Sequence, residues 1–121
     1  IVIAAGVPSA SIKEWLGANC PPLFLVIPNI AIAQLASMTF IVPCDTTQQQ
    51  TELIQGIFND MGTSLLTDEQ HLASGTTLAS CGIAYAMRYI RAAAEGGVEL
   101  GFKADDAKKI VMQTMIFSSP K

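Results

Sequence analysis

Short apolar runs recur through the first half of the chain and predict strands. They lie at Ile1–Ala5, Leu23–Ile27, Met38–Val42 and Thr63–Leu66. Runs of this length, with little polar alternation, are typical of buried strands in a parallel sheet that is covered on both faces. Gly6 follows the first run and is expected to turn the chain out of the strand.

Two helices are predicted between these strands. The first covers Ser9–Leu16, with its apolar residues on one side, and Gly17 ends it. The second begins at Thr47, because Thr47 and Gln50 have the spacing of a capping box. Its apolar stripe contains Leu53, Ile54, Ile57, Phe58 and Met61. Gly62 stands where a glycine commonly ends a helix.

From Thr67 onward the pattern predicts only helix. A long helix is expected over Gly82–Leu100, and a further one follows it. Small residues make the long helix thin, so that another backbone can approach it. Its apolar stripe contains Ile83, Met87, Ile90, Ala94 and Val98. The predicted fold is therefore α/β over residues 1–67, followed by an all-α part over residues 68–121.

The composition indicates that part of the surface is covered by protein. Hydrophobic residues make up 50% of the chain, charged residues only 14%, and the mean hydropathy is +0.42. The longest apolar run, Leu23–Ala36, is interrupted by polar residues and Pro28, so it does not predict a membrane span. We expect an oligomer interface or another part of the same protein, and the absent initiator Met favours a fragment or a processed chain.

Charge and metal-binding residues exclude several classes of function. The net charge is −3 and the longest basic cluster is Lys108-Lys109, which argues against a nucleic-acid partner. Cys20, Cys44 and Cys81 lack paired spacing, and the one histidine cannot complete a zinc site. We expect reduced thiols, no metal and a cytoplasmic location.

Three segments carry a resemblance to a known family. They are Ile3-Ala4-Ala5-Gly6-Val7, Val26-Ile27-Pro28-Asn29-Ile30-Ala31 and Thr76-Thr77-Leu78-Ala79-Ser80-Cys81-Gly82-Ile83-Ala84-Tyr85. In this order and at these separations the chain resembles pyrroline-5-carboxylate reductase. The family motifs are S-I-A-A-G-I/V, then M-P-N-T-P-A, then D-E followed by T-A-L-S-G-S-G-P-A-Y. Asp68-Glu69, Thr76, Leu78, Gly82, Ala84 and Tyr85 fall at matching positions.

The resemblance implies an enzyme of two parts. The C-terminal part of a Rossmann-type sheet would hold NAD or NADP, and the first helices of a helical dimerisation domain would form a homodimer or a higher oligomer. The reaction would be reduction of the C=N bond of 1-pyrroline-5-carboxylate, giving L-proline. The G-x-G-x-x-G fingerprint and the S-P-G-G-T-T loop of the family are absent from this chain; Ser118-Ser119-Pro120 bears a faint resemblance to the start of that loop, but the glycines of the loop do not follow. The segment alone is therefore expected to be inactive.

The resemblance also implies site residues, each with a structural alternative. Cofactor binding would involve Ala4, Ala5, Gly6 and Asn29; substrate binding would involve Asn29, Thr76, Ser80, Cys81 and Gly82. No catalytic residue is assigned. Asn29 could instead form a turn by hydrogen bonding to its own backbone. Ala4–Gly6 could instead be a buried strand followed by a tight turn. Thr76 could instead cap the start of a helix. Cys81 could instead be a reactive thiol at a helix N-terminus, or a small buried residue. His71 is expected to be solvated in a connecting segment.

Departures from the family motifs leave other functions open. Ile30 and Ala31 replace a Thr and a Pro, and residues 79–83 lack a Gly, a Ser and a Pro of the family motif. A diverged reductase acting on another imine or ketone is one alternative. A β-hydroxyacid or prephenate type of dehydrogenase would need a catalytic Lys or His in the first helices of the second part, where Arg88 and Arg91 instead lie on the polar face. A non-catalytic helical association module would pack Ala79–Ala84 on protein and leave no cleft.

Overall fold

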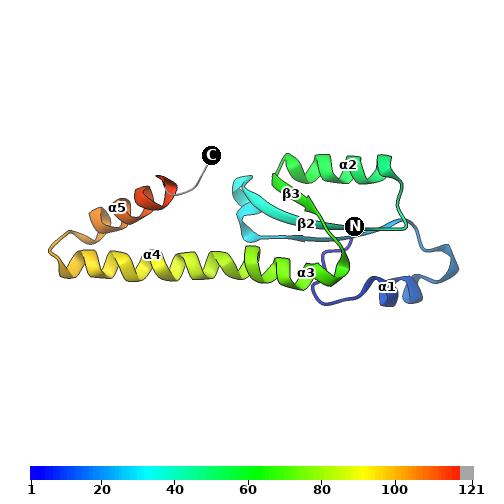
Figure 1. Cartoon of the computed structure of the whole chain (residues 1–121), viewed down its shortest axis with the longest axis horizontal. Coiled ribbons are helices and arrows are strands. Elements are labelled where there is room, and N and C mark those ends of the chain that lie inside the picture. The colour runs from blue at the N-terminus through cyan, green and yellow to red at the C-terminus, as the bar shows by residue number, and fades with distance from the viewer. Residues whose placement is uncertain (118–121) are drawn as a thin grey trace. The chain divides into compact units, whose positions relative to one another are not determined.

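The computed structural model describes residues 1–117 of the chain, and Ser118-Ser119-Pro120 lie outside the described residues. The chain divides into two compact units, residues 1–81 and residues 82–121. Figure 1 colours the chain from the N-terminus to the C-terminus and labels most of its helices and strands. The boundary predicted near Thr67 stays a prediction for the domains of the whole protein.

A three-stranded mixed sheet forms the centre of the first unit. Its strands are β1 (Leu23–Pro28), β2 (Ser37–Cys44) and β3 (Gly62–Leu66), in the spatial order β1-β2-β3. β2 and β3 are parallel, as expected, but β1 and β2 are antiparallel, with Leu23 opposite Cys44. The all-parallel expectation was wrong, because the link between β1 and β2 holds only a short 3-10 segment, η2 (Ile30–Gln34). A link this short returns the chain antiparallel, whereas a parallel crossover needs a dozen or more residues.

The run at the start of the chain makes one isolated bridge instead of the predicted strand. Val2 pairs with Leu25 in parallel, and its N–H donates to the Phe24 carbonyl at 2.8 Å. The N–H of Val26 donates back to the Val2 carbonyl at 2.9 Å. The residues that follow are therefore held beside β1, at the edge of the described sheet.

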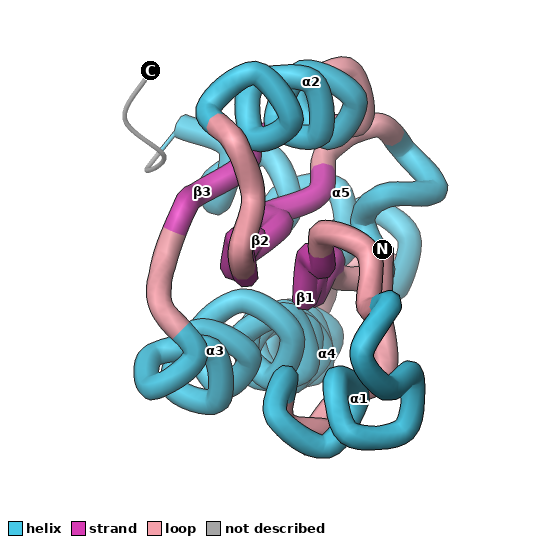
Figure 2. Tube along the Cα trace, turned by 90° about the vertical axis from the view of Figure 1, so that its right-hand side faces the viewer, coloured by secondary structure: helices cyan, strands magenta, loops and turns pink. Residues whose placement is uncertain are grey.

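Helices cover both faces of the sheet (Figure 2). On one face lie α1 (Ser9–Leu16), which continues into the 3-10 turn η1 (Gly17–Asn19), and α3 (Glu69–Thr76); α2 (Gln48–Asn59) lies on the other. The first face buries Ile12, Leu23, Leu25 and Val42, with Leu72 against them; the second buries Phe24, Val26, Ile41 and Phe58, with Ile54 and Met61 against them. Leu53 and Ile57, predicted as part of the apolar stripe of α2, are 64% and 43% exposed.

The prediction for α2 was right at its N-terminal end and wrong at its C-terminal end. The capping box is confirmed: the Gln50 N–H donates to Thr47 Oγ1 at 3.2 Å, and the Thr47 N–H donates to Gln50 Oε1 at 2.9 Å. The prediction that Gly62 ends the helix was wrong. The helix is capped at Asp60, and Gly62 begins β3 with a φ of 143°. A Cβ on Gly62 would lie 2.2 Å from the Ser37 carbonyl oxygen, so β2 and β3 approach through this glycine.

The segment predicted to connect the two parts contains a helix. Asp68 caps α3 by accepting a hydrogen bond from the His71 N–H at 2.9 Å, and His71 Nδ1 lies 2.7 Å from the same carboxylate. His71 is exposed but lies in the first turn of α3, so its placement in a connecting segment was wrong. Gly75 of α3 lies on the ring of Phe40, where a Cβ would come within 2.9 Å. This contact seats α3 on β2.

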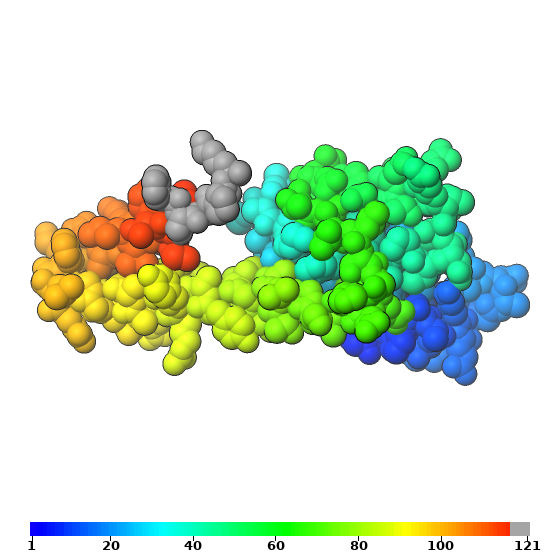
Figure 3. All heavy atoms as spheres, viewed as in Figure 1, coloured from blue at the N-terminus to red at the C-terminus, as the bar shows by residue number. Residues whose placement is uncertain are grey.

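The second unit is a pair of helices, α4 (Gly82–Glu99) and α5 (Ala104–Phe117). In Figure 3 their spheres, yellow and orange to red, lie against each other. Gly97 and Ala107 meet at the crossing, since a Cβ on Gly97 would lie 3.0 Å from the Ala107 Cβ. The thin part of α4 therefore packs on a helix of the same chain, and Gly101, with a φ of 99°, lies in the turn between the two.

Many large apolar side chains of this second unit are exposed. Among the described residues they are Tyr85, Met87, Tyr89, Val98, Leu100, Phe102, Ile110, Met112 and Ile116. Met87, Val98 and Met112 also line an apolar groove of about 520 Å³ between α4 and α5. Part of the high hydropathy of the chain thus lies on uncovered helix faces of this unit. No helix among residues 1–117 is long and apolar enough to cross a membrane.

Candidate functional site

A pocket of about 200 Å³ opens in the first unit beside the end of β1. Three elements form it: the segment after the Val2 bridge, the strand β1 and the helix α3. Its lining residues are Ala4, Ala5, Gly6, Val7, Pro8, Leu25, Ile27, Glu69, Leu72, Ala73 and Thr76. Pockets for drug-sized molecules are usually about 300–1,000 Å³, so this one suits a single ring or the end of a larger ligand.

The backbone leaves one wall of the pocket without bulk. Gly6 has a φ of 76°, a conformation that favours glycine, and a Cβ there would meet no atom within 4 Å. Ala4 and Ala5 are exposed, so the alternative of a buried strand was wrong, whereas the tight turn at Ala5-Gly6 is confirmed. The predicted cofactor residues Ala4, Ala5 and Gly6 therefore share one pocket with Thr76, a predicted substrate residue.

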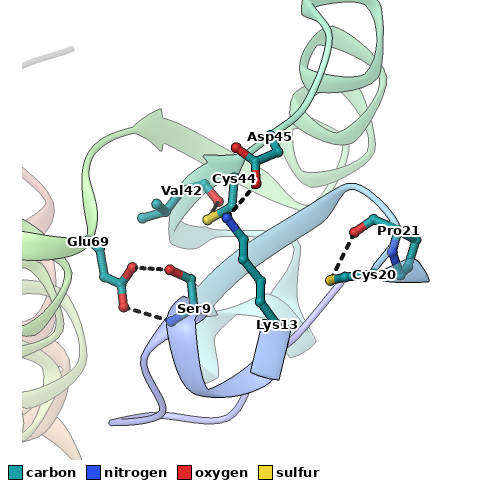
Figure 4. Close-up of polar contacts among 8 residues, drawn as sticks. All are labelled: Ser9, Lys13, Cys20, Pro21, Val42, Cys44, Asp45 and Glu69. Carbon is teal, nitrogen blue, oxygen red and sulfur yellow. Dashed lines mark hydrogen bonds and ion pairs between the residues drawn. The ribbon is translucent and has the colours of Figure 1, made fainter. Parts of the chain in front are cut away.

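Glu69 joins two walls of the pocket through Ser9 (Figure 4). Glu69 Oε1 accepts from the Ser9 N–H at 2.8 Å, and Oε2 accepts from Ser9 Oγ at 2.6 Å. Pro8, at the N-cap of α1, makes no side-chain cap, so a carboxylate from α3 takes that role and also complements the helix dipole. The pairing of Ser9 with Glu69 was not predicted from the sequence, although Pro8 at the N-cap position indicates that another residue must cap the helix.

Figure 4 also shows Lys13 and two cysteines of the first unit, Cys20 and Cys44. Lys13 pairs with Asp45, and this hydrogen bond raises the pKa of the Lys13 ammonium. Burial raises the pKa of the Cys44 thiol, whose sulfur lies 3.8 Å from the Val42 carbonyl oxygen. Cys20, Cys44 and Cys81 are all free. Thiolate chemistry at Cys44 is disfavoured by its surroundings.

Asn29 is fixed at the end of β1 by four hydrogen bonds. It is 9% exposed; its Oδ1 accepts from the Ala31 N–H at 3.2 Å, and its carbonyl accepts from the Ile32 N–H at 3.1 Å. Its own N–H donates to Ser37 Oγ at 3.3 Å, and its Nδ2 donates to the Ala79 carbonyl at 3.1 Å. The alternative of a local turn former is confirmed by the bond to Ala31, and the bond to Ala79 adds a contact 50 residues away.

The remaining predicted substrate residues lie on or beside a π-helical turn, η3 (Thr77–Cys81). Thr76 precedes it, and its Oγ1 donates to the Leu72 carbonyl at 2.8 Å, so the alternative of a cap at a helix start was wrong. Cys81 is exposed and lies within continuous helical structure, so both of its alternatives, a buried residue and a helix N-terminus, were wrong. Ser80 is half-buried, and Gly82 begins α4 with open space where a Cβ would be.

Except for Gly82, which begins the second unit, the predicted residues lie in two places within the first unit. Ala4, Ala5, Gly6 and Thr76 line the pocket, whereas Asn29 contacts the π turn that carries Ser80 and Cys81. Within residues 1–117, no three His, Cys, Asp or Glu side chains gather in a way that could hold a metal ion. The binding roles of these residues stay predictions.

Comparison with known proteins gives one family. The family model described as pyrroline-5-carboxylate reductase dimerisation matches residues 69–119. Pyrroline-5-carboxylate reductase 1 of Dictyostelium discoideum is 35% identical over 126 residues, covering 94% of this chain and 23% of its own. Pyrroline-5-carboxylate reductase 2 of the same organism is 34% identical over 128 residues, covering 94% of this chain and 43% of its own.

Solved structures agree. The 1-pyrroline-5-carboxylate reductase of Streptococcus pyogenes matches with a TM-score of 0.89 and 26% identity, over 96% of this chain and 45% of that one. Plasmodium falciparum pyrroline carboxylate reductase, solved with NADP bound, has the same fold, with a TM-score of 0.83 and 21% identity, over 96% of this chain and 49% of that one.

These relatives are longer than the chain, which spans less than half of each of them. The matches nevertheless cover almost all of this chain, in both the sheet and the helices. The small sheet and the helices after it are accordingly part of a Rossmann-type domain and of a helical dimerisation domain. Together these comparisons support membership of the chain in the pyrroline-5-carboxylate reductase family.

Proposed function

We propose that the full-length protein reduces 1-pyrroline-5-carboxylate to L-proline with NADPH or NADH, which is a step of proline biosynthesis. The observation that carries this proposal is the pocket beside β1, where Ala4–Gly6 and Thr76 lie together. Family membership gives the reaction class, and the pocket gives the place in this chain at which the reacting ring would lie.

In this proposal the pocket receives only the nicotinamide end of the cofactor. Its volume of about 200 Å³ and its small apolar walls suit one flat ring. The glycine fingerprint that binds the pyrophosphate is not in this sequence, so those contacts belong to another segment of the protein. When bound, the dinucleotide supplies the hydride for the C=N bond.

The residues of this chain would orient the ring and keep water away from it. Gly6 and the two alanines let the ring lie close to the backbone, and Leu25 and Ile27 supply apolar surface. Thr76 Oγ1 already donates its proton to the Leu72 carbonyl, so its oxygen is left to accept a hydrogen bond. An amide N–H of the nicotinamide carboxamide is a suitable donor for it.

We further propose a cytoplasmic homodimer built through the helical unit. Seven large apolar side chains of α4 and α5, including Tyr85, Tyr89 and Met112, are exposed in the single chain. A second copy that covers these faces would remove this apolar surface from water. The three free cysteines suit a reducing compartment.

Two other functions remain as outcomes of the test. The changed motifs at Ile30, Ala31 and residues 79–83 are the reason to consider reduction of a different imine or ketone. An association module without a ligand site would need residues 79–84 packed on protein, yet Cys81 and Ala84 are exposed and Gly82 faces open space within this chain.

The test is an assay of the full-length protein with 1-pyrroline-5-carboxylate and either NADPH or NADH. We expect dinucleotide oxidation with formation of an equal amount of L-proline, and oxidation of L-proline by NADP⁺ or NAD⁺ at alkaline pH. Turnover of another cyclic imine or a ketone, with none of 1-pyrroline-5-carboxylate, would establish the diverged reductase. A dimer that binds neither dinucleotide would establish the association module.

A further inference from the structure

Asn29 connects two parts of the first unit that are distant in sequence. Its side chain uses both ends: Oδ1 caps η2 through the Ala31 N–H, and Nδ2 donates to the Ala79 carbonyl at 3.1 Å. The second bond reaches the middle of the π turn Thr77–Cys81. An aspartate has the same shape but offers no amide donor, and a serine could cap but could not reach as far.

The position of Asn29 is itself fixed by buried polar groups. Its N–H donates to Ser37 Oγ, which lies 2.9 Å from Thr39 Oγ1. Ser37 and Thr39 are almost completely buried in β2. Because the backbone of Asn29 is anchored to a central strand, its amide is a fixed donor rather than a mobile one.

The π turn is the segment that needs such a donor. π turns are rare, occur mostly as single turns within α-helices, and are frequent at functional sites. Thr76 and Thr77, at its start, direct their hydroxyls back to the carbonyls of Leu72 and Ala73, at 2.8 and 3.2 Å. Hydroxyls bonded in this way bend helices, and the Asn29 amide adds a bond from outside the helix.

We propose that Asn29 is a positioning residue whose amide holds the π turn against the end of β1, and so sets where Ser80 and Cys81 are presented. This inference rests on the proposed function, since it assumes that the turn contacts the substrate. Besides its bonds to Ala79 and Ala31, the side-chain amide has one hydrogen and one lone pair left, but its main role is to hold the turn.

The experiment compares Asn29→Ser with Thr47→Ala in the full-length protein. Serine retains the cap of η2 and loses the bond to Ala79, whereas Thr47→Ala removes a cap of similar strength in α2, which has no link to the turn. Asn29→Asp is the second variant, because it keeps the shape and the acceptor oxygen.

Hydrogen exchange is the first measurement, because it does not depend on activity. Amides of residues 77–85 should exchange about fivefold faster in Asn29→Ser, as expected for one lost hydrogen bond, and at the parent rate in Thr47→Ala. Unchanged exchange in both Asn29 variants would overturn the proposal. If the full-length protein proves not to reduce 1-pyrroline-5-carboxylate, this measurement still decides whether Asn29 holds the turn.

Kinetics then separate positioning from direct contact. With 1-pyrroline-5-carboxylate as substrate, Asn29→Ser should raise KM by about tenfold and leave the Kd for NADPH unchanged, because the turn moves and the pocket does not. Weaker NADPH binding with an unchanged KM would show that Asn29 contacts the cofactor, and would overturn the positioning role. Thr47→Ala should retain the parent KM.

Discussion

Gly62 offers a sharp test of how the first unit is packed. In β3 it lies opposite Ser37 of β2, and a Cβ at this position would be 2.2 Å from the Ser37 carbonyl oxygen and 2.3 Å from its nitrogen. Neither neighbour is the end of a flexible side chain. The substitution Gly62→Ala must therefore displace the backbone of β2.

The magnitude follows from two costs. Overpacking against a rigid neighbour costs about 1–3 kcal/mol, and placing an alanine at a φ of 143° costs about 1–3 kcal/mol more. Gly62→Ala should thus lower the free energy of unfolding by about 2–6 kcal/mol. Ser37 also accepts the Asn29 N–H, so the displacement should reach the π turn.

The matched control is Gly56→Ala, in the middle of α2. A Cβ there meets no atom within 4 Å, and alanine in a helix interior is favoured over glycine by about 0.5–1 kcal/mol. Urea unfolding of the full-length protein, followed by circular dichroism, should show one variant destabilised and the other stabilised. A Gly62→Ala protein as stable as its parent would refute the close approach of β2 and β3.

Three further predictions concern the caps and the helical unit. Asp68→Ala should destabilise the protein at neutral pH, because the hydrogen bond from the His71 N–H lowers the pKa of Asp68 in the folded state. The contribution of Asp68 to stability is fully present above its unfolded pKa of about 4 and is lost as the pH falls through its folded pKa. A difference in stability from the parent that persists undiminished at pH 2 would contradict this. Glu69→Ala should cost about 1 kcal/mol, measured by urea unfolding, since it removes both bonds to the start of α1, and Glu69→Gln should recover part of that loss. Gly97→Val should separate α4 from α5 and lower Tm. Gly96→Ala should leave Tm unchanged or raise it, because a Cβ at Gly96 would meet open space. Equal Tm values for the two variants would contradict the close helix crossing.

Local patterns predicted α1, α2 and the capping box of α2. The capping box at Thr47 and the helix over Ser9–Leu16 were predicted correctly, because such signals depend on residues a few positions apart. Strand direction was not predictable in the same way. β1 is apolar along its whole length in either orientation, and only the short link before β2 determines that the pair is antiparallel.

The candidate site was predicted in part through the order of family motifs. That order placed Ala4–Gly6 and Thr76 in one site, and they share a pocket. The bonds from Ser9 to Glu69 and from Asn29 to Ala79 join residues 60 and 50 positions apart, which no local pattern reveals. Helix was expected from Thr67 onward, but the bounds of α3 were not predicted, because this helix contains a glycine and buries little apolar surface of its own.

The central claim is that the pocket beside β1 receives the reacting end of the dinucleotide. The most direct measurement is kcat/KM of the full-length Ala5→Phe variant with 1-pyrroline-5-carboxylate and NADPH, beside Ala18→Phe, an exposed residue of η1 outside the pocket. We predict a loss of about hundredfold or more for Ala5→Phe and parent activity for Ala18→Phe, with both proteins folded. Full activity of the Ala5→Phe protein would place the reacting ring elsewhere and contradict the account.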